Sequence, residues 1–291
     1  SGTGAPTDDI ISVNASTLFA FGINFTIKSE YRIISNFGRL NYDYDNKYLF
    51  SMVYRYDGVS SLAPDNRWGF FPGMSAGWNV HREKFFQNSS ISNVISTVKP
   101  RISYGVNGNV AGIGDYEVQG VYGAQGNYNG GLGFLNTGII NSGLRWEKST
   151  TTDVGIDLGF LNNRISVMFD YYDRKTSDLL TNLALPSYLG FGSVRTNLGT
   201  FQNKGYELTI NANVFALKNG LTLDVSANVA NNKNKILKLP YNGNENNRQG
   251  GFQIYDASSG KIIWVSGLQE GQQLGEVYAY KQLSIFQDAA E

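Results

Sequence analysis

Three stretches of this chain alternate largely between apolar and polar side chains, and this alternation restricts the fold more than any other feature. The stretches are 48–57, 165–172 and 206–214. Successive side chains of a β-strand point to opposite faces, so each stretch predicts a strand with one apolar and one polar face. A tilted strand of roughly nine to eleven residues crosses a bilayer, which favours the wall of a membrane barrel. We expect ten apolar residues on its convex outer face: Tyr48, Phe50, Met52, Ile165, Val167, Phe169, Leu208, Ile210, Leu223 and Val225.

The composition suits many strands joined by turns. Aromatic residues make up 13% of the 291 residues, charged residues make up 16%, and there are 34 glycines. Soluble domains carry about 25% charged residues, so this chain is poor in charge. With 24 basic and 24 acidic residues it lacks the basic excess typical of nucleic-acid binding. The absence of cysteine excludes a thiolate nucleophile, a disulfide framework and a cysteine-ligated metal.

The pattern predicts about nine strands in an all-β, antiparallel arrangement. Residues 1–30 are expected to be an irregular extracellular loop or strand end, and 82–97 to hold one or two helical turns. No apolar run is long enough for a transmembrane helix. The expected strands lie near 34–44, 48–57, 73–80, 99–107, 146–160, 164–174, 205–216, 221–231 and 275–280.

The connections between these strands sort by length. If successive turns alternate between two rims, the tight turns at 45–47, 161–163 and 217–220 share one rim. The long, mobile loops 109–142, 176–202 and 233–270 then share the other. Transmembrane barrels have short periplasmic turns and long extracellular loops, so this sorting favours a membrane barrel. The exception is 81–97, which is long but falls on the short-turn rim.

Several motifs resemble the barrel of SusC/RagA-type TonB-dependent transporters, in the same order and spacing over about residues 31–286. The resemblance implies an antiparallel 22-stranded transmembrane barrel in the bacterial outer membrane. It also implies an N-terminal plug domain, a SusD-like surface lipoprotein as partner, energy from TonB, and oligosaccharides or peptides as substrates. The motifs are Phe37–Tyr42, Arg55–Gly58, Arg67–Pro72, Ser75–Trp78, Ser103–Asn109, Leu144–Glu147, Asp157–Arg164, Asp170–Tyr172, Asn203–Glu207 and the region from Gly275 to Phe286.

The chain departs from that family in extent. About nine strands are expected rather than 22, and nothing resembles a plug domain. We therefore interpret 31–291 as a partial barrel, an internal piece of a transporter. A soluble β-sandwich that acts as a surface adhesin or carbohydrate-binding module is the alternative, and an enzyme is a more distant third.

Four residues are candidate substrate-binding residues. Tyr122 and Tyr128 lie in the Gly-rich loop, where they could stack on a sugar or peptide side chain or pack on a neighbouring loop. Arg55 and Asp57 lie on the polar side of the second strand.

No catalytic, cofactor or metal site is expected. The lone histidine, His81, is interpreted as a rim residue, and the carboxylate pairs Asp153/Asp157 and Asp170/Asp173 as lumen-facing rather than catalytic. An aromatic girdle at the membrane surface is favoured over a substrate site for four aromatic residues: Trp68, Phe70, Trp78 and Trp146.

Overall fold

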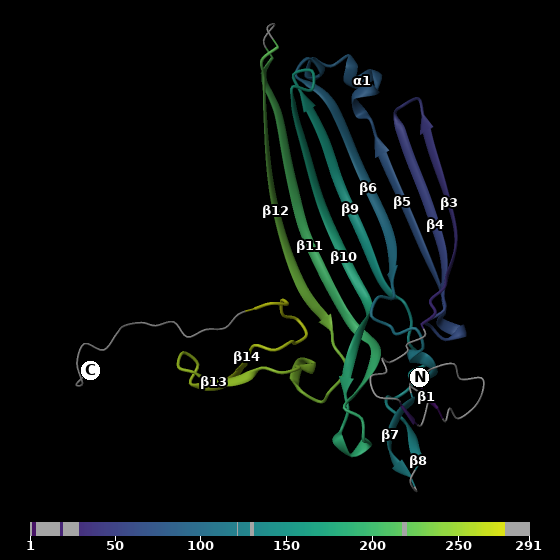
Figure 1. Ribbon diagram of the computed structural model, residues 1–291. Coiled ribbons are helices and arrows are strands. Elements are labelled where there is room, and N and C mark those ends of the chain that lie inside the picture. Colours follow the sequence, from purple (N-terminus) through teal and green to yellow (C-terminus); the bar gives the residue numbers. More distant parts are fainter. Residues whose placement is uncertain are drawn as a thin grey trace, which may run out of the picture.

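A computed structural model describes residues 2–3, 18–19, 29–120, 122–128, 131–216 and 220–276. Among these residues, eight long strands form one antiparallel sheet in the order β12-β11-β10-β9-β6-β5-β4-β3 (Figure 1). The strands are β3 (Ile33–Tyr44), β4 (Tyr48–Val59), β5 (Trp68–Trp78), β6 (Ile95–Asn109), β9 (Glu147–Phe160), β10 (Ile165–Ala184), β11 (Ser193–Ala216) and β12 (Thr222–Lys238).

The remaining elements are short. Two-stranded sheets are formed by β1 with β2, β7 with β8, and β13 with β14. The bounds of these strands are Gly2–Thr3, Leu18–Phe19, Tyr122–Tyr128, Gly131–Asn136, Phe252–Asp256 and Lys261–Val265. The helix α1 is Lys84–Gln87, and 3₁₀ turns lie at Pro64–Asn66, Val80–Arg82, Ser90–Asn93, Glu117–Gln119, Ser187–Leu189 and Glu245–Asn247.

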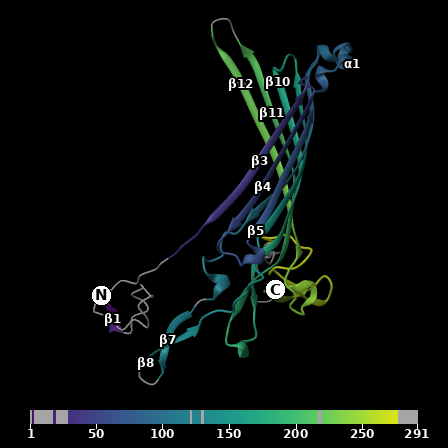
Figure 2. The ribbon, with the colours of Figure 1, turned by 90° about the vertical axis from the view of Figure 1, so that its right-hand side faces the viewer.

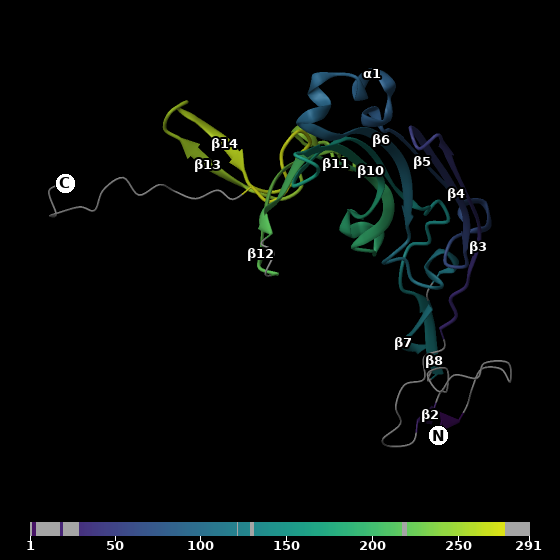
Figure 3. The ribbon, with the colours of Figure 1, turned by 90° about the horizontal axis from the view of Figure 1, so that it is seen from above.

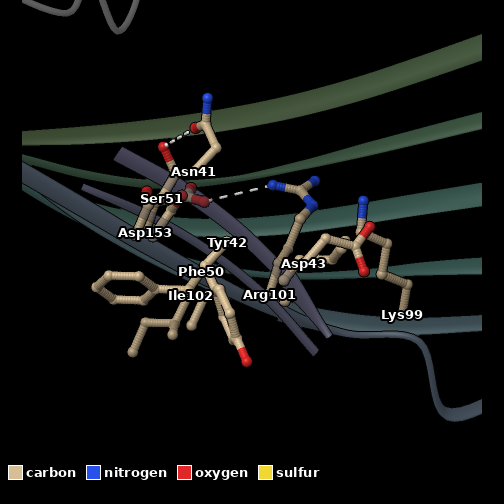
Figure 4. A pocket seen from close by; sticks show the side chains of 14 residues that line it. Asn41, Tyr42, Asp43, Phe50, Ser51, Lys99, Arg101, Ile102 and Asp153 are labelled. Atoms are coloured by element: carbon tan, nitrogen blue, oxygen red, sulfur yellow. Dashed lines mark hydrogen bonds and ion pairs between the residues drawn. The ribbon is translucent and has the colours of Figure 1, made fainter. Parts of the chain in front are cut away.

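The register places most of the apolar residues of the eight strands on one face, because directly paired residues share a face of the sheet. Phe169 is paired with Ile156 on β9 and with Leu208 on β11. The sheet curves into an arc (Figure 3), and Figure 4 shows Phe50 and Ile102 pointing away from its hollow side while polar side chains point into it. A single row of pairs crosses seven strands: Tyr42, Phe50, Ala76, Ile102, Val154, Tyr171 and Tyr206.

The ten residues expected on the convex face all lie there by register, so this prediction is confirmed. They are not packed against a second sheet: Phe50 is 41% exposed and Val225 is 49% exposed. A sandwich would bury these side chains between two sheets. The soluble β-sandwich alternative is therefore wrong for the part of the chain that the structure describes.

The apolar surface forms a belt of limited height. On β10 it consists of Ile165 and the three alternate residues that end at Tyr171, a span of about 20 Å. The apolar band of a transmembrane barrel is about 25 Å tall. Beyond Tyr171 the same face becomes polar, and Lys204 Nζ lies 3.1 Å from a carboxylate oxygen of Asp173. The belt thus has the height and the polar edge of a lipid-facing surface.

Apart from the β5–β6 connection, short and long connections lie at opposite ends of the sheet (Figure 1, Figure 2). The 45–47 turn is joined to the β5–β6 connection, where Asn79 N donates to Lys47 O at 2.7 Å. The 161–163 turn reaches the same connection through Leu161 N and Val94 O, 2.9 Å apart. These two turns therefore share a rim, as predicted. Residues 217–219 of the third turn lie outside the described residues.

Several predicted loops prove to be structured. The prediction of a loop at 176–202 is wrong. Strands β10 and β11 continue there as a paired ribbon, and only residues 185–192 separate them. Its Thr, Asn and Gly content suggested a loop, but residues 180–184 pair with 193–197 on β11. The other two long loops contain the hairpins β7–β8 and β13–β14. Most of the expected 1–30 and 275–280 segments lie outside the described residues.

A bulge interrupts the β10–β11 ribbon where it leaves the belt. The register shifts between Ser177 and Leu180, and Asp178 has a left-handed φ of 57°. The buried side chain of Asn197 holds this irregularity. Its amide donates to Asp178 O at 2.7 Å and to Arg145 O at 2.8 Å, and its Oδ1 accepts from Arg145 N at 2.9 Å.

A small apolar core lies at the long-loop end. Phe71 projects from the concave face of β5, and its ring meets Trp146 edge-on at 5.1 Å between centroids. Trp146 is 6% exposed and its Nε1 donates to Arg67 O at 2.9 Å. The girdle interpretation is therefore wrong for Trp146, because the loops fold over it. The buried members of this core are Val59, Leu62, Phe71, Ile113, Val118, Leu144 and Trp146.

Candidate functional site: the concave polar face

Small polar side chains form a continuous row on the concave face. Each is directly paired with the next across the sheet, and Ser51 Oγ donates to Asn41 Oδ1 at 2.8 Å. The row lines a hollow of about 500 Å³, shown in Figure 4. Hydroxyl, amide and carboxylate groups can exchange hydrogen bonds with water or with a polar solute. The members, from β3 to β9, are Asn41, Ser51, Ser75, Ser103 and Asp153.

One guanidinium beside this row binds carboxylates from two neighbouring strands. Arg101 lies on β6, and both of the first two carboxylates lie on β9. Arg101 Nε is 3.1 Å from Asp157 Oδ1, and Arg101 Nη1 is 3.5 Å from Asp153 Oδ1. It also contacts both carboxylate oxygens of Asp170 on β10 at 2.7 Å. Planar guanidinium groups suit such paired contacts. The cluster therefore joins three strands through side chains on the lumen-facing side.

Gly155 makes this cluster possible. It is the direct partner of both Arg101 and Asp170, so the ion pair passes over it. A Cβ at this position would lie 2.3 Å from Asp170 Oδ1 and 2.7 Å from Arg101 Cζ. Only a residue without a side chain leaves room for the contact.

The carboxylate pairs singled out in the sequence separate into different roles. Asp153 and Asp157 are four residues apart and share the concave face, as expected. Asp170 shares it too, but Asp173 is three residues further and lies on the convex face, so the lumen-facing interpretation is wrong for Asp173. The carboxylate of Asp173 instead accepts from Gln202 Nε2 at 2.8 Å.

Arg55 and Asp57 lie together on the concave face of β4. Arg55 Nε is 3.2 Å from Asp57 Oδ2, and the Arg55 guanidinium lies 5.8 Å from the centre of the Phe37 ring. Asp57 is buried and Arg55 is about half exposed. Both line a second hollow of about 370 Å³ with Phe71 and Asn107. The pair therefore presents one accessible cation at the long-loop end of the concave face.

The two candidate tyrosines lie on a different element. Tyr122 begins β7, pairs with Asn136 and is 67% exposed. The β7–β8 hairpin lies beyond the end of the main sheet (Figure 1), so the structure does not place Tyr122 on the same sheet as Arg55 and Asp57. The Tyr128 side chain lies outside the described residues.

Three of the four predicted girdle residues lie on the convex face. Trp68 stacks on Tyr56 with ring centroids 4.9 Å apart, and Phe70 is 55% exposed. Trp78 stacks on Tyr48 at 6.3 Å, at the opposite end of the belt. Aromatic side chains at both edges of an apolar band are typical of membrane barrels. Their positions agree with the girdle interpretation.

Two further observations concern the short-turn rim and the helices. His81 lies at the rim, as expected, with Nδ1 3.2 Å from Val98 O. Among the described residues, no helix is both long and apolar enough to cross a bilayer.

A curved antiparallel sheet with a lipid-facing belt outside and a polar, charged face inside defines the wall of an outer-membrane barrel. The sequence profile of the family described as "TonB dependent receptor-like, beta-barrel" matches residues 3–267. The chain belongs to this family of TonB-dependent transporters and receptors, which are outer-membrane proteins and not enzymes.

Known relatives place the chain near the SusC and RagA branch. It is 40% identical over 218 residues to the TonB-dependent receptor SusC of Bacteroides thetaiotaomicron, covering 71% of this chain and 21% of that protein. It is 36% identical over 265 residues to the TonB-dependent receptor P3 of Formosa agariphila, covering 89% of this chain and 25% of that protein. The chain thus spans about a quarter of the curated relatives it matches.

Solved structures agree with this placement. The chain superposes on the RagAB peptide importer in its open-open state with a TM-score of 0.68 and 26% identity, covering 90% of this chain and 27% of that one. The superposition on the closed-closed state has a TM-score of 0.67 and 28% identity, and it covers 83% of this chain and 25% of that one.

Proposed function

We propose that residues 31–291 form part of the wall of a SusC-type TonB-dependent transporter that imports oligosaccharides or peptides. The two-faced sheet carries the proposal: a belt of lipid-facing height outside, and inside it a polar row with an Arg–Asp cluster. A hydrated passage needs such an inner surface. The similarity to the RagAB peptide importer supports peptides, and oligosaccharides are proposed from the resemblance of the motifs to SusC-type transporters.

We further propose a SusD-like surface lipoprotein and TonB as partners of the complete transporter. The similarity to SusC and RagAB supports both. The other proposed partners are outer-membrane lipid and a glycan or peptide substrate. Nucleic acid is not proposed as a partner.

The test is uptake by cells that carry the full-length protein. Cells that lack the gene are given oligosaccharides or peptides as the sole nutrient and are then complemented with the intact gene. We expect growth on one of the two classes to be lost, restored by the intact gene, and abolished when TonB is removed. Unchanged growth on both substrate classes would contradict the transport proposal.

Arg55, Asp57, Tyr122 and Tyr128 remain the proposed substrate-contacting residues. Arg55 is the sharpest test, because its guanidinium is half exposed in a hollow of the concave face. Arg55→Met should raise the substrate concentration that half-saturates uptake. Lys233→Met is the control, because Lys233 is exposed and lies on the convex face beyond the belt. Equal uptake by both variants would remove Arg55 from the site.

A further inference from the structure

The β5–β6 connection, residues 79–94, is the one long segment on the short-turn rim of the described sheet. It contains α1 and two 3₁₀ turns. A short turn would suffice to join two antiparallel strands. Figure 3 shows α1 outside the arc of the sheet, on its convex side. The segment therefore leaves the rim toward the side that carries the lipid-facing belt.

Three large apolar side chains of this segment are exposed, among polar ones. Phe85 is 63% exposed, Ile91 is 57% exposed and Val94 is 53% exposed. The exposed charges next to them are both basic, Arg82 and Lys84. An apolar surface edged by basic residues is typical of segments that lie in the headgroup region of a membrane.

The apolar side chains continue the aromatic girdle of the sheet. Tyr44, Tyr48 and Trp78 stack in sequence with centroid separations of 6.3 Å. Phe85 extends the series, since its ring lies 6.5 Å from that of Trp78. A girdle of this kind marks the level of the membrane–water interface. Phe85 therefore lies at the same level as residues that already face lipid.

The acidic residue of the segment fixes it in this position. Glu83 Oε1 accepts from Tyr48 Oη at 2.7 Å and from Trp78 Nε1 at 3.2 Å, and Lys47 Nζ lies 3.8 Å from Oε2. The Tyr48 hydrogen bond keeps the pKa of Glu83 below its usual value, so the carboxylate stays charged at neutral pH. The polar ends of two girdle residues thus hold the connection against the belt.

We infer that residues 79–94 form an interfacial anchor that lies in the headgroup region of the leaflet at the short-turn rim. In this anchor Phe85 and Ile91 enter the acyl boundary, and Arg82 and Lys84 face the lipid phosphates. Continuity with the girdle identifies lipid as the occupant, rather than a second copy or a periplasmic protein. The anchor is independent of the transported substrate, because it lies on the convex side of the wall.

The test places a fluorescent label in the full-length protein. Phe85→Cys and Ile91→Cys are each labelled with an environment-sensitive dye and reconstituted in vesicles of phosphatidylethanolamine and phosphatidylglycerol. The vesicles also contain a phosphatidylcholine that carries a nitroxide. The described part of this chain has no cysteine that would compete for the label. Asn162→Cys, in the exposed tight turn on the same rim, is the control.

We expect blue-shifted emission and severalfold stronger quenching by the lipid nitroxide at positions 85 and 91 than at 162. A water-soluble quencher should act in the opposite order. If 85 and 91 behave like 162, the anchor does not exist. A shift that needs added protein would show a protein occupant and would also overturn the inference. Heat-modified gel mobility confirms that each variant is folded, so a failed barrel is distinguished from an absent anchor.

Discussion

Arg101 and Asp170 form a 2.7 Å ion pair across an intervening strand, and the residue between them is Gly155. A charged pair can bridge two strands only if the strand between them offers no side chain. The charge cluster on the concave face therefore depends on the absence of a side chain at position 155.

Gly155→Ala should weaken the wall. The new methyl group would overlap both partners of the ion pair, and overpacking of this kind costs about 1–3 kcal/mol. The temperature at which the full-length protein loses its heat-modified gel mobility measures the effect. Gly105→Ala is the matched control. Gly105 lies on β6, on the same concave face of the sheet as Gly155, and a Cβ added there would have no atom within 4 Å. Equal temperatures for both variants would show that the cluster tolerates displacement.

Phe169→Arg should impair insertion into the membrane. Phe169 lies mid-belt on the convex face, where an Arg near the bilayer midplane costs about 2–4 kcal/mol. Met168→Arg is the control, because Met168 lies on the concave face and is paired with Asp157. The folded and unfolded bands of purified outer membranes report the outcome. If both variants fold equally well, the convex face does not meet lipid.

Phe71→Ala should loosen the long-loop rim without unfolding the sheet. Phe71 is 5% exposed and packs on Trp146, and such a truncation costs about 3–5 kcal/mol. We expect faster protease cleavage in 59–67 and 110–118 of the full-length protein in membranes. Phe70→Ala removes the same ring from the exposed side of β5 and should leave cleavage unchanged. Equal cleavage of the two variants would contradict the proposed role of this core.

The β13–β14 hairpin should loosen in acid. Hydrogen bonds from Ser259 and Ser258 lower the pKa of Asp256 to about 2, from an ordinary value of 3.8. Because the folded pKa is the lower one, this stabilisation is present above pH 3.8 and is lost as the pH falls toward 2. Amide exchange of 252–265, corrected for its intrinsic pH dependence, should rise in that interval. Asp256→Asn should show no such rise, and a rise in both would assign the effect to another group.

The sequence predicted the faces of the sheet well because alternation is a local property of each strand. The positions of Phe50 and Phe169 follow from a period of two. The turns at 45–47 and 161–163 were equally local, since Asp45 and Asn162 adopt the left-handed backbone that such residues tolerate.

The Arg101 cluster was missed because it depends on the register between strands that are about 50–70 residues apart. The one available signal was a glycine between two aspartates, Asp153 and Asp157, in an alternating strand. The burial of Trp146 was missed for a related reason, since a loop folds over it only in three dimensions. The paired length of β10 and β11 was missed because polar residues and glycines scattered through 176–202 interrupt the alternation there.

The bulge at Asp178 divides the β10–β11 ribbon into two units that differ in register. A bulge bends a strand and absorbs a change of register. The residues before it set the pairing of the wall, and the residues after it form an arm that stands above the lipid. Because Asn197 closes three hydrogen bonds at the junction, we expect substitutions further along the arm to leave the register of the strands below it undisturbed. The long-loop end of the ribbon can therefore change in sequence while the strands below the bulge keep their register.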